Sequence, residues 1–127
     1  GYDPEAYCYV YTPSGDYLQT VEGTPFEIAL ECKSKAGLDD KVGSDDATEI
    51  LKKARDNSNA YVTVGTPTFT DDAKDAARET GVLLLDAPAL VAAMVRIQQG
   101  ELDPDQIRDF FSQTGYLSRS DVYDYEP

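Results

Sequence analysis

The chain has 127 residues, of which 24 are acidic and 11 are basic, so its formal net charge is −13. It contains no histidine, which excludes His-based triads, His-ligated zinc and imidazole general bases. The two cysteines, Cys8 and Cys32, are too few for a disulfide framework or a four-thiolate metal site. With 127 residues, of which 41% are apolar, the chain can bury enough apolar surface to form one globular domain.

The sequence also limits where the protein is found. No stretch approaches the roughly 18 consecutive apolar residues of a membrane span, and no basic segment followed by an apolar stretch indicates a signal peptide. We therefore expect a cytoplasmic protein. Because the first residue is not Met, we also expect the sequence to be a fragment of a longer protein.

The excess of acidic side chains has more than one explanation. Sixteen Asp, eight Glu and only six Lys resemble the surface of a halophilic protein, since a Debye length of about 3 Å at 1 M salt screens self-repulsion. An ordinary acidic domain and a nucleic-acid mimic are the alternatives. An acidic surface by itself argues against DNA, because binding neutralises phosphates with Lys and Arg. Salt adaptation is the favoured interpretation. Under it, the negative charge reflects the salt concentration around the protein and says little about what the protein binds.

The N-terminal part of the chain predicts three strands joined by short turns. Strands are expected at residues 6–12 and 17–22, with the turn Pro13-Ser14-Gly15-Asp16 between them. The third, residues 26–33, places Phe26, Ile28, Leu30 and Cys32 on one face and Glu27, Ala29, Glu31 and Lys33 on the other. These strands predict an antiparallel meander in which the second face of residues 26–33 is polar. Both cysteines are expected to be small buried side chains.

Helices and strands alternate in the rest of the chain. Ser44 is expected to cap a helix over about 45–56, and Thr70 a helix over about 71–80 that ends at Gly81. Further strands are expected at 60–65 and 82–86, and further helices near 87–98 and 104–113. A strand, helix and strand in that order form a parallel crossover. The predicted class is α/β, a mixed sheet flanked by helices in the order β-β-β-α-β-α-β-α-α, with residues 115–127 as a C-terminal tail.

One carboxylate and one ammonium group stand two residues apart on the predicted polar face. Glu31 and Lys33 form this pair, and Glu27 lies on the same face. A cross-strand ion pair is the simplest interpretation. Phosphodiester hydrolysis is another, because carboxylates hold the Mg²⁺ that polarises the phosphate and lowers the pKa of a bound water. A nearby lysine orients the water and offsets developing charge.

An acid-x-Lys strand that follows a hairpin with another carboxylate resembles the PD-(D/E)xK nuclease superfamily. The segment PSGDYLQTVEGTPFEIALECK at 13–33 is similar, without a gap, to the active-site segment in the cleavage domain of FokI, a type IIS restriction endonuclease. Three further stretches resemble the same domain: VGSDDATEILKKA, AYVTVG and the long run over residues 81–111. The resemblance implies a restriction-endonuclease-like fold over residues 1–114. It also implies a Mg²⁺-dependent endonuclease that cuts DNA and takes its specificity from a recognition domain outside this fragment.

The resemblance also assigns roles to residues. It implies that Glu31 is an acidic metal ligand, that the backbone carbonyl of Cys32 adds a further oxygen ligand, and that Lys33 is the lysine of the motif. Ser14 stands where the motif has its first acid, directly after proline. Asp16 is expected to replace that acid, and Glu27 is a second candidate. The implied catalytic set is therefore Asp16, Glu31 and Lys33, with Mg²⁺ as the cofactor.

Three interpretations of Ser14 stay open: a natural variant rescued by Asp16, an inactivating change, or lost activity. The resemblance implies that the helix after the motif forms a transient homodimer through the segment Asp46–Ile50. The alternative interpretation is a solvated amphipathic helix. Two other functions remain as alternatives. One is a catalytically inactive nuclease-fold module for dimerisation or regulation, and the other is a structure-specific repair or junction nuclease.

Overall fold

A five-stranded mixed sheet forms the centre of the molecule, in the order β1-β2-β3-β4-β5. The computed structural model describes residues 6–37, 39–54 and 57–126. The strands are β1 (Ala6–Tyr9), β2 (Glu27–Ser34), β3 (Ala60–Thr66), β4 (Leu83–Asp86) and β5 (Gly115–Leu117). Only the β1–β2 pairing is antiparallel, and the other three pairings are parallel. The predicted α/β class with one mixed sheet is confirmed.

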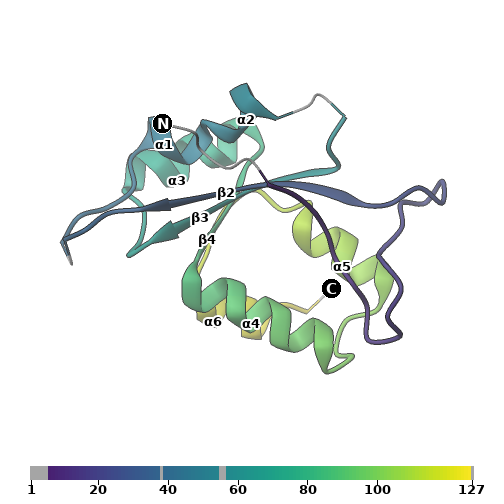
Figure 1. Ribbon diagram of the computed structural model, residues 1–127. Coiled ribbons are helices and arrows are strands. Elements are labelled where there is room, and N and C mark those ends of the chain that lie inside the picture. The colour runs from purple at the N-terminus through teal and green to yellow at the C-terminus, as the bar shows by residue number, and fades with distance from the viewer. Residues whose placement is uncertain (1–5, 38, 55–56, 127) are drawn as a thin grey trace.

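Helices cover both faces of this sheet (Figure 1). On one face lie α1 (Ser44–Thr48), α2 (Ile50–Lys53) and α3 (Asp71–Thr80). On the other lie α4 (Ala87–Gln98), α5 (Pro104–Phe111) and α6 (Arg119–Asp124). Among the helices in the described ranges, none is long and apolar enough to cross a membrane.

The parallel crossover β3-α3-β4 is confirmed, together with both ends predicted for its helix. The side chain of Thr70 accepts a hydrogen bond from the Ala73 N–H, as an N-cap does. Gly81 ends the helix with a φ of 95°, a left-handed conformation that glycine adopts without the strain of a Cβ. Sequence signals are reliable here because both caps act within a few residues.

The predicted three-strand meander is wrong. Residues 17–22 form no strand; Tyr17 and Gln19 make isolated bridges to Tyr11 and Pro25, and β1 pairs directly with β2. Two turns cause this. One is closed by the Thr12 and Asp16 backbones and the other by those of Thr20 and Thr24, which leaves a very short extended stretch between them.

The single helix predicted over 45–56 is interrupted at Glu49. The hydroxyl of the buried Thr63 donates a 2.8 Å hydrogen bond to the Ala47 carbonyl, the group that residue 51 would use in a continuous helix. The N-cap is Gly43 rather than Ser44, and α2 ends at Lys53. Residues 55–56 of the prediction lie outside the described residues.

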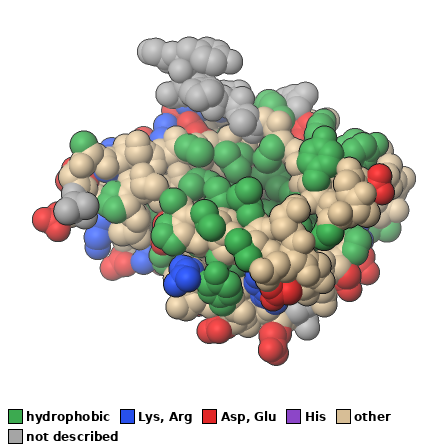
Figure 2. Space-filling model, turned by 60° about the horizontal axis from the view of Figure 1, so that its bottom comes forward, with side chains coloured by type: hydrophobic (Ala, Val, Ile, Leu, Met, Phe, Trp, Pro, Cys, Tyr) green, Lys and Arg blue, Asp and Glu red, His purple; other side chains and the backbone are tan. Residues whose placement is uncertain are grey.

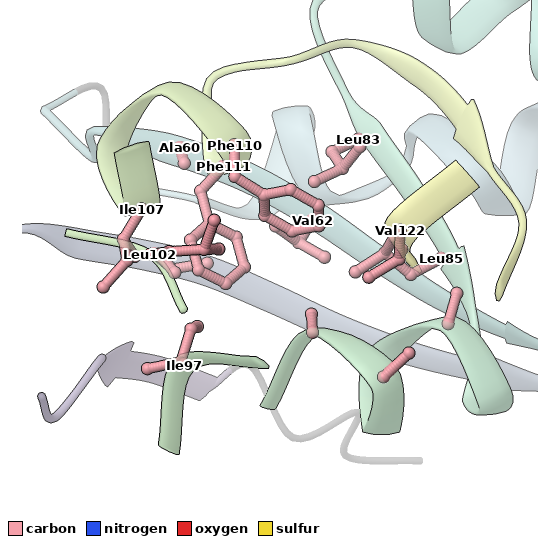
Figure 3. Packing of buried hydrophobic residues seen from close by; sticks show 14 of the residues in the cluster. Ala60, Val62, Leu83, Leu85, Ile97, Leu102, Ile107, Phe110, Phe111 and Val122 are labelled. Carbon is pink, nitrogen blue, oxygen red and sulfur yellow. The ribbon is translucent and has the colours of Figure 1, made fainter. Parts of the chain in front are cut away.

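The prediction of a C-terminal tail after residue 114 is wrong as well. β5 extends the sheet beside β4, and α6 begins with a capping box in which Ser118 and Asp121 exchange hydrogen bonds. Val122 on α6 is 1% exposed in the main hydrophobic cluster, some of which Figure 3 shows. A strand of three residues has no readable periodicity, so only its pairing with β4 identifies it.

Apolar side chains are packed on both faces of the sheet. The larger cluster lies between the sheet and α4, α5 and α6, and the smaller one lies under α1, α2 and α3. The face of β2 that the sequence predicted to be polar is therefore covered: Ala29 is 0% and Glu31 is 3% exposed. Cys32, predicted to be buried, is exposed.

An apolar groove lies on the side of the sheet that faces away from Glu31. Figure 2 shows a face of the molecule on which hydrophobic side chains gather at the centre. The groove runs between β1 and α4, and Tyr9, Tyr11 and Met94 in its lining are each more than 40% exposed. Patches of this kind are common at interaction surfaces. This surface and the polar cluster described below are separate features of the fold.

We expect the substitution Val122→Ala to lower the free energy of unfolding by about 2 kcal/mol, because it removes two buried methyl groups from the cluster under α6. The matched control is Val21→Ala, since Val21 is 86% exposed and should change stability by less than about 0.5 kcal/mol. Urea denaturation measures both. Equal effects for the two variants would contradict the docking of α6 on the core.

Candidate active site

Glu31 is a buried carboxylate in the middle of the sheet. It lies on β2, between β1 and β3 in the strand order, with Thr63 as its register partner on β3. Its side chain is 3% exposed, and Glu31 and Thr63 are the buried polar residues of the described ranges. The Thr63 hydroxyl is directed to the Ala47 carbonyl instead. Because an isolated buried carboxylate is costly, Glu31 needs cationic partners.

Two lysines supply those partners, and Glu49 joins them. Lys33 Nζ lies 3.1 Å and Lys53 Nζ 3.0 Å from the same oxygen of Glu31, Oε1. Lys33 Nζ also contacts Glu49 Oε2, and Lys53 Nζ lies 3.1 Å from Glu49 Oε1. These four side chains, here called the ion-pair ring, alternate in charge and sum to zero. β2 contributes two members, α2 contributes Lys53, and the helix break contributes Glu49.

The ring favours the charged forms of Lys33 and Glu49. Burial lowers the pKa of Lys33, but hydrogen bonds and charges from Glu49 and Glu31 outweigh it, so that the pKa is raised overall. Hydrogen bonds from Lys33 and Lys53 lower the pKa of Glu49. Lys33 is therefore an ammonium group at neutral pH, able to contact an anion that approaches the ring.

One oxygen of the ring has no partner. Glu31 Oε2 is a buried side-chain atom without a hydrogen bond. A buried carboxylate oxygen left in this way normally contacts a water or an ion. The cluster nevertheless does not fit a divalent cation in this arrangement, because two ammonium groups occupy Glu31 Oε1. Among the residues that the structure describes, no group of three His, Cys, Asp or Glu side chains converges on one point.

Asp16, predicted to complete the catalytic set, is not part of the ion-pair ring. Because β1 runs antiparallel to β2, with Tyr9 opposite Glu27, the chain leaves β1 at the end of β2 that lies away from Lys33. The turn over residues 12–16 follows there, and Ser14 donates a hydrogen bond to Asp16 within it. Both residues are exposed and line a hollow with Arg108 of α5, on the other side of the sheet from α1 and α2 (Figure 1).

The other predicted ligands are also apart from Glu31. Glu27 shares its face but lies four residues earlier on β2, about 13 Å along the strand. Its carboxylate accepts a 3.1 Å hydrogen bond from Ser58. The Cys32 side chain is exposed, and alternation along the strand places it on the opposite face. The role predicted for the Cys32 carbonyl stays a prediction. The structure thus brings together Glu31 and Lys33 of the predicted set.

Sequence reasoning did not identify Glu49 and Lys53 as members of the site. A signal was present, since the two residues lie four apart in a predicted helix, where side chains share a face. The segment Asp46–Ile50 was instead predicted as a dimer contact. Ile50 is 1% exposed in the smaller core, and Asp46 pairs with Lys35 at 3.2 Å. Ile50 is therefore not available to a second chain.

A comparison with protein families shows that a family model, Mrr_cat, described as restriction endonuclease, matches residues 15–94. This range covers more than half of the chain and includes β2, the helix break and the whole ion-pair ring. Neither a search of curated proteins nor a search of solved structures gave a match.

We expect the substitution Glu49→Gln to lower the thermal midpoint at about pH 7, because two lysines lose an anionic partner. The pKa of Glu49 is lowered from 4.5, so its contribution is complete above that value and is lost as the pH falls through the lowered pKa. The gap between wild type and variant should therefore close below pH 4.5. Thermal unfolding followed by circular dichroism measures it, with exposed Glu22→Gln as the control. A gap that is independent of pH would contradict this role.

Proposed function

Because the chain belongs to the Mrr_cat restriction endonuclease family, we propose that it hydrolyses DNA phosphodiester bonds at Glu31 and Lys33. The proposed reaction depends on a divalent cation, of which Mg²⁺ is the first candidate. The observation that carries this proposal is the buried carboxylate of Glu31, with one oxygen unpartnered, directly beside the Lys33 ammonium. We extend the domain through α6, because β5 and α6 complete the sheet and core.

The chemistry proposed for this chain's own residues is limited to what the ion-pair ring can do. The raised pKa of Lys33 keeps its side chain charged, so that it contacts a phosphate oxygen and offsets the negative charge that develops during hydrolysis. The Lys33 backbone lies inside a sheet, paired with Gly65, which fixes where its charge is presented. Glu31 is equally fixed on the same strand.

The local charge opposes a polyanion less than the net charge of the chain does. Six of the 11 basic residues fall within residues 31–55, against six acidic residues in the same segment. This segment, which contains the ion-pair ring, is therefore formally neutral in a chain of net charge −13. We propose that a salty environment screens the remaining repulsion, and that sequence specificity, as in type IIS enzymes, comes from a recognition domain elsewhere in the protein.

A second candidate function is a catalytically inactive module with the same fold. Two observations favour it: Ser14 stands in place of the acid of the motif, and the charges of the ion-pair ring are already balanced by its own members. Such a module would bind DNA or a partner without cutting.

A plasmid nicking assay distinguishes the two candidates. We expect wild-type protein to nick supercoiled DNA in Mg²⁺, and EDTA to abolish nicking. Glu31→Gln and Lys33→Met should each reduce the rate by at least about 100-fold, the usual effect of removing a group that acts in the transition state. Lys74→Met on α3 is the matched control, and circular dichroism verifies folding. Assays at about 0.1 M and about 2 M salt test the salt adaptation. No nicking in either salt would leave the inactive module.

Asp16 has its own test. Because it lies in an exposed turn outside the ion-pair ring, we expect Asp16→Asn to retain the nicking rate within about threefold. Ser14→Ala should behave in the same way. A loss with Asp16→Asn as large as that with Glu31→Gln would return Asp16 to the catalytic set and require the turn to approach β2 differently during catalysis.

A further inference from the structure

The helix α4 is apolar on its exposed side as well as on the side that faces the core. Among its 12 residues only Arg96 is charged, in a chain of which 28% is charged. The Arg96 side chain donates hydrogen bonds to the carbonyls of Val122 and Tyr125, so its charge is directed to the C-terminal segment. A helix that is apolar around most of its circumference is normally covered on both sides. The exposed side of α4 is therefore typical of an interaction surface.

Exposed apolar side chains gather around α4 and the apolar groove beside it. Val91, Met94 and Val95 stand at the i, i+3 and i+4 spacing that forms one stripe along a helix. Tyr9 and Tyr11 are exposed in the lining of the groove. These five residues make up most of the eight large apolar side chains that are exposed in the described ranges. Figure 2 shows hydrophobic side chains at the centre of one face, with acidic side chains toward its margin.

The apolar groove adjoins an acidic hollow. The groove has a volume of about 350 Å³, and no described residue of its lining is charged. Tyr11 lines the groove, and the next residue, Thr12, lines a hollow of about 660 Å³ that also contains Asp16 and Asp105. The basic side chain of that lining, Arg108, is already paired with Asp105. Asp16 forms no ion pair with the described residues, so its exposed carboxylate is open to a cationic partner.

We propose that the apolar groove and the acidic hollow together form a docking site for an amphipathic helix of another protein, with a lysine or arginine at one end of that helix. The helix lies along α4, where the stripe of Val91, Met94 and Val95 has the spacing that a second helix packs against. Its basic end lies at Asp16. The inference does not depend on the proposed nuclease function, because the groove and Glu31 lie on opposite faces of the sheet.

Charge favours this occupant over two others. DNA brings phosphates, which an uncharged groove beside an acidic hollow does not neutralise. A second copy of the chain brings a net charge of −13 and a second Asp16, so two copies repel each other at low salt. A basic helix is instead attracted to the acidic hollow, and this attraction speeds its association and fixes its direction in the groove.

The first test selects helical peptides of about 16 residues, long enough for about four turns, from a displayed random library with the wild-type protein as the target. We expect the enriched peptides to carry apolar residues at i, i+3, i+4 and i+7 and a lysine or arginine at one end. Enrichment of acidic peptides, or of none, overturns the inference. Analytical ultracentrifugation of the protein alone tests the second copy, and a dimer that Met94→Gln abolishes overturns the inference as well.

The second test measures the affinity of one enriched peptide for variants by fluorescence anisotropy. Met94→Gln removes an apolar contact without changing the charge, and we expect it to weaken binding at least about fivefold at both low and high salt. Asp16→Asn removes one charge and should weaken binding about threefold at about 0.1 M salt, but not at about 1 M, where the charge is screened.

The matched control for Asp16→Asn is Asp72→Asn on α3, the same change on the other face of the sheet. It should bind the peptide as wild type does, and circular dichroism verifies the folding of all three variants. Wild-type affinity in Met94→Gln overturns the groove as the docking site. An effect of Asp16→Asn that equals that of Asp72→Asn, or that persists at high salt, overturns the role of the acidic hollow.

Discussion

A carboxylate buried inside a sheet has to be neutralised, and this requirement organises the region around Glu31. Burying an unpaired charge costs several kcal/mol, so the fold must bring cations to a residue whose backbone cannot move. Lys33 comes from the same strand, two residues on, and Lys53 comes from α2 above it. The partners of Glu31 thus link the sheet to the segment that follows it in sequence.

The interruption between α1 and α2 is part of the same arrangement. The Thr63 hydroxyl donates a hydrogen bond to the Ala47 carbonyl near the end of α1, and Glu49 lies at the break that follows. Glu49 and Lys53 both reach the ring from this segment. A polar side chain on β3 therefore shapes the segment that supplies half of the ring. Glu31 and its neighbours lie toward the carboxyl end of β2, which is the usual place for ligands in sheets with parallel strands.

The sequence predicts well what depends on nearby residues. The cap at Thr70, the helix end at Gly81 and the shared face of Glu31 and Lys33 are all readable from short patterns, and the structure confirms each of them. Long-range contacts are not readable in this way. The sequence near Ala47 carries no signal that the Thr63 hydroxyl donates a hydrogen bond to its carbonyl. Residues 115–117 likewise carry no strand pattern of their own, and only their pairing with β4 identifies them as a strand. The resemblance to a known motif predicts that Asp16 lies near Glu31. The antiparallel register of β1 instead places the turn that contains Asp16 at the far end of β2.

The net charge of −13 has less bearing on DNA binding than it first seems to have. At physiological salt the Debye length is about 8 Å, so acidic groups on distant surfaces repel a phosphate weakly. The charges close to a DNA phosphate therefore determine how strongly it is repelled. In the ion-pair ring, two carboxylates are balanced by two ammonium groups. A site can hold acidic ligands for a cation and still admit a polyanion if those ligands carry their own counter-ions.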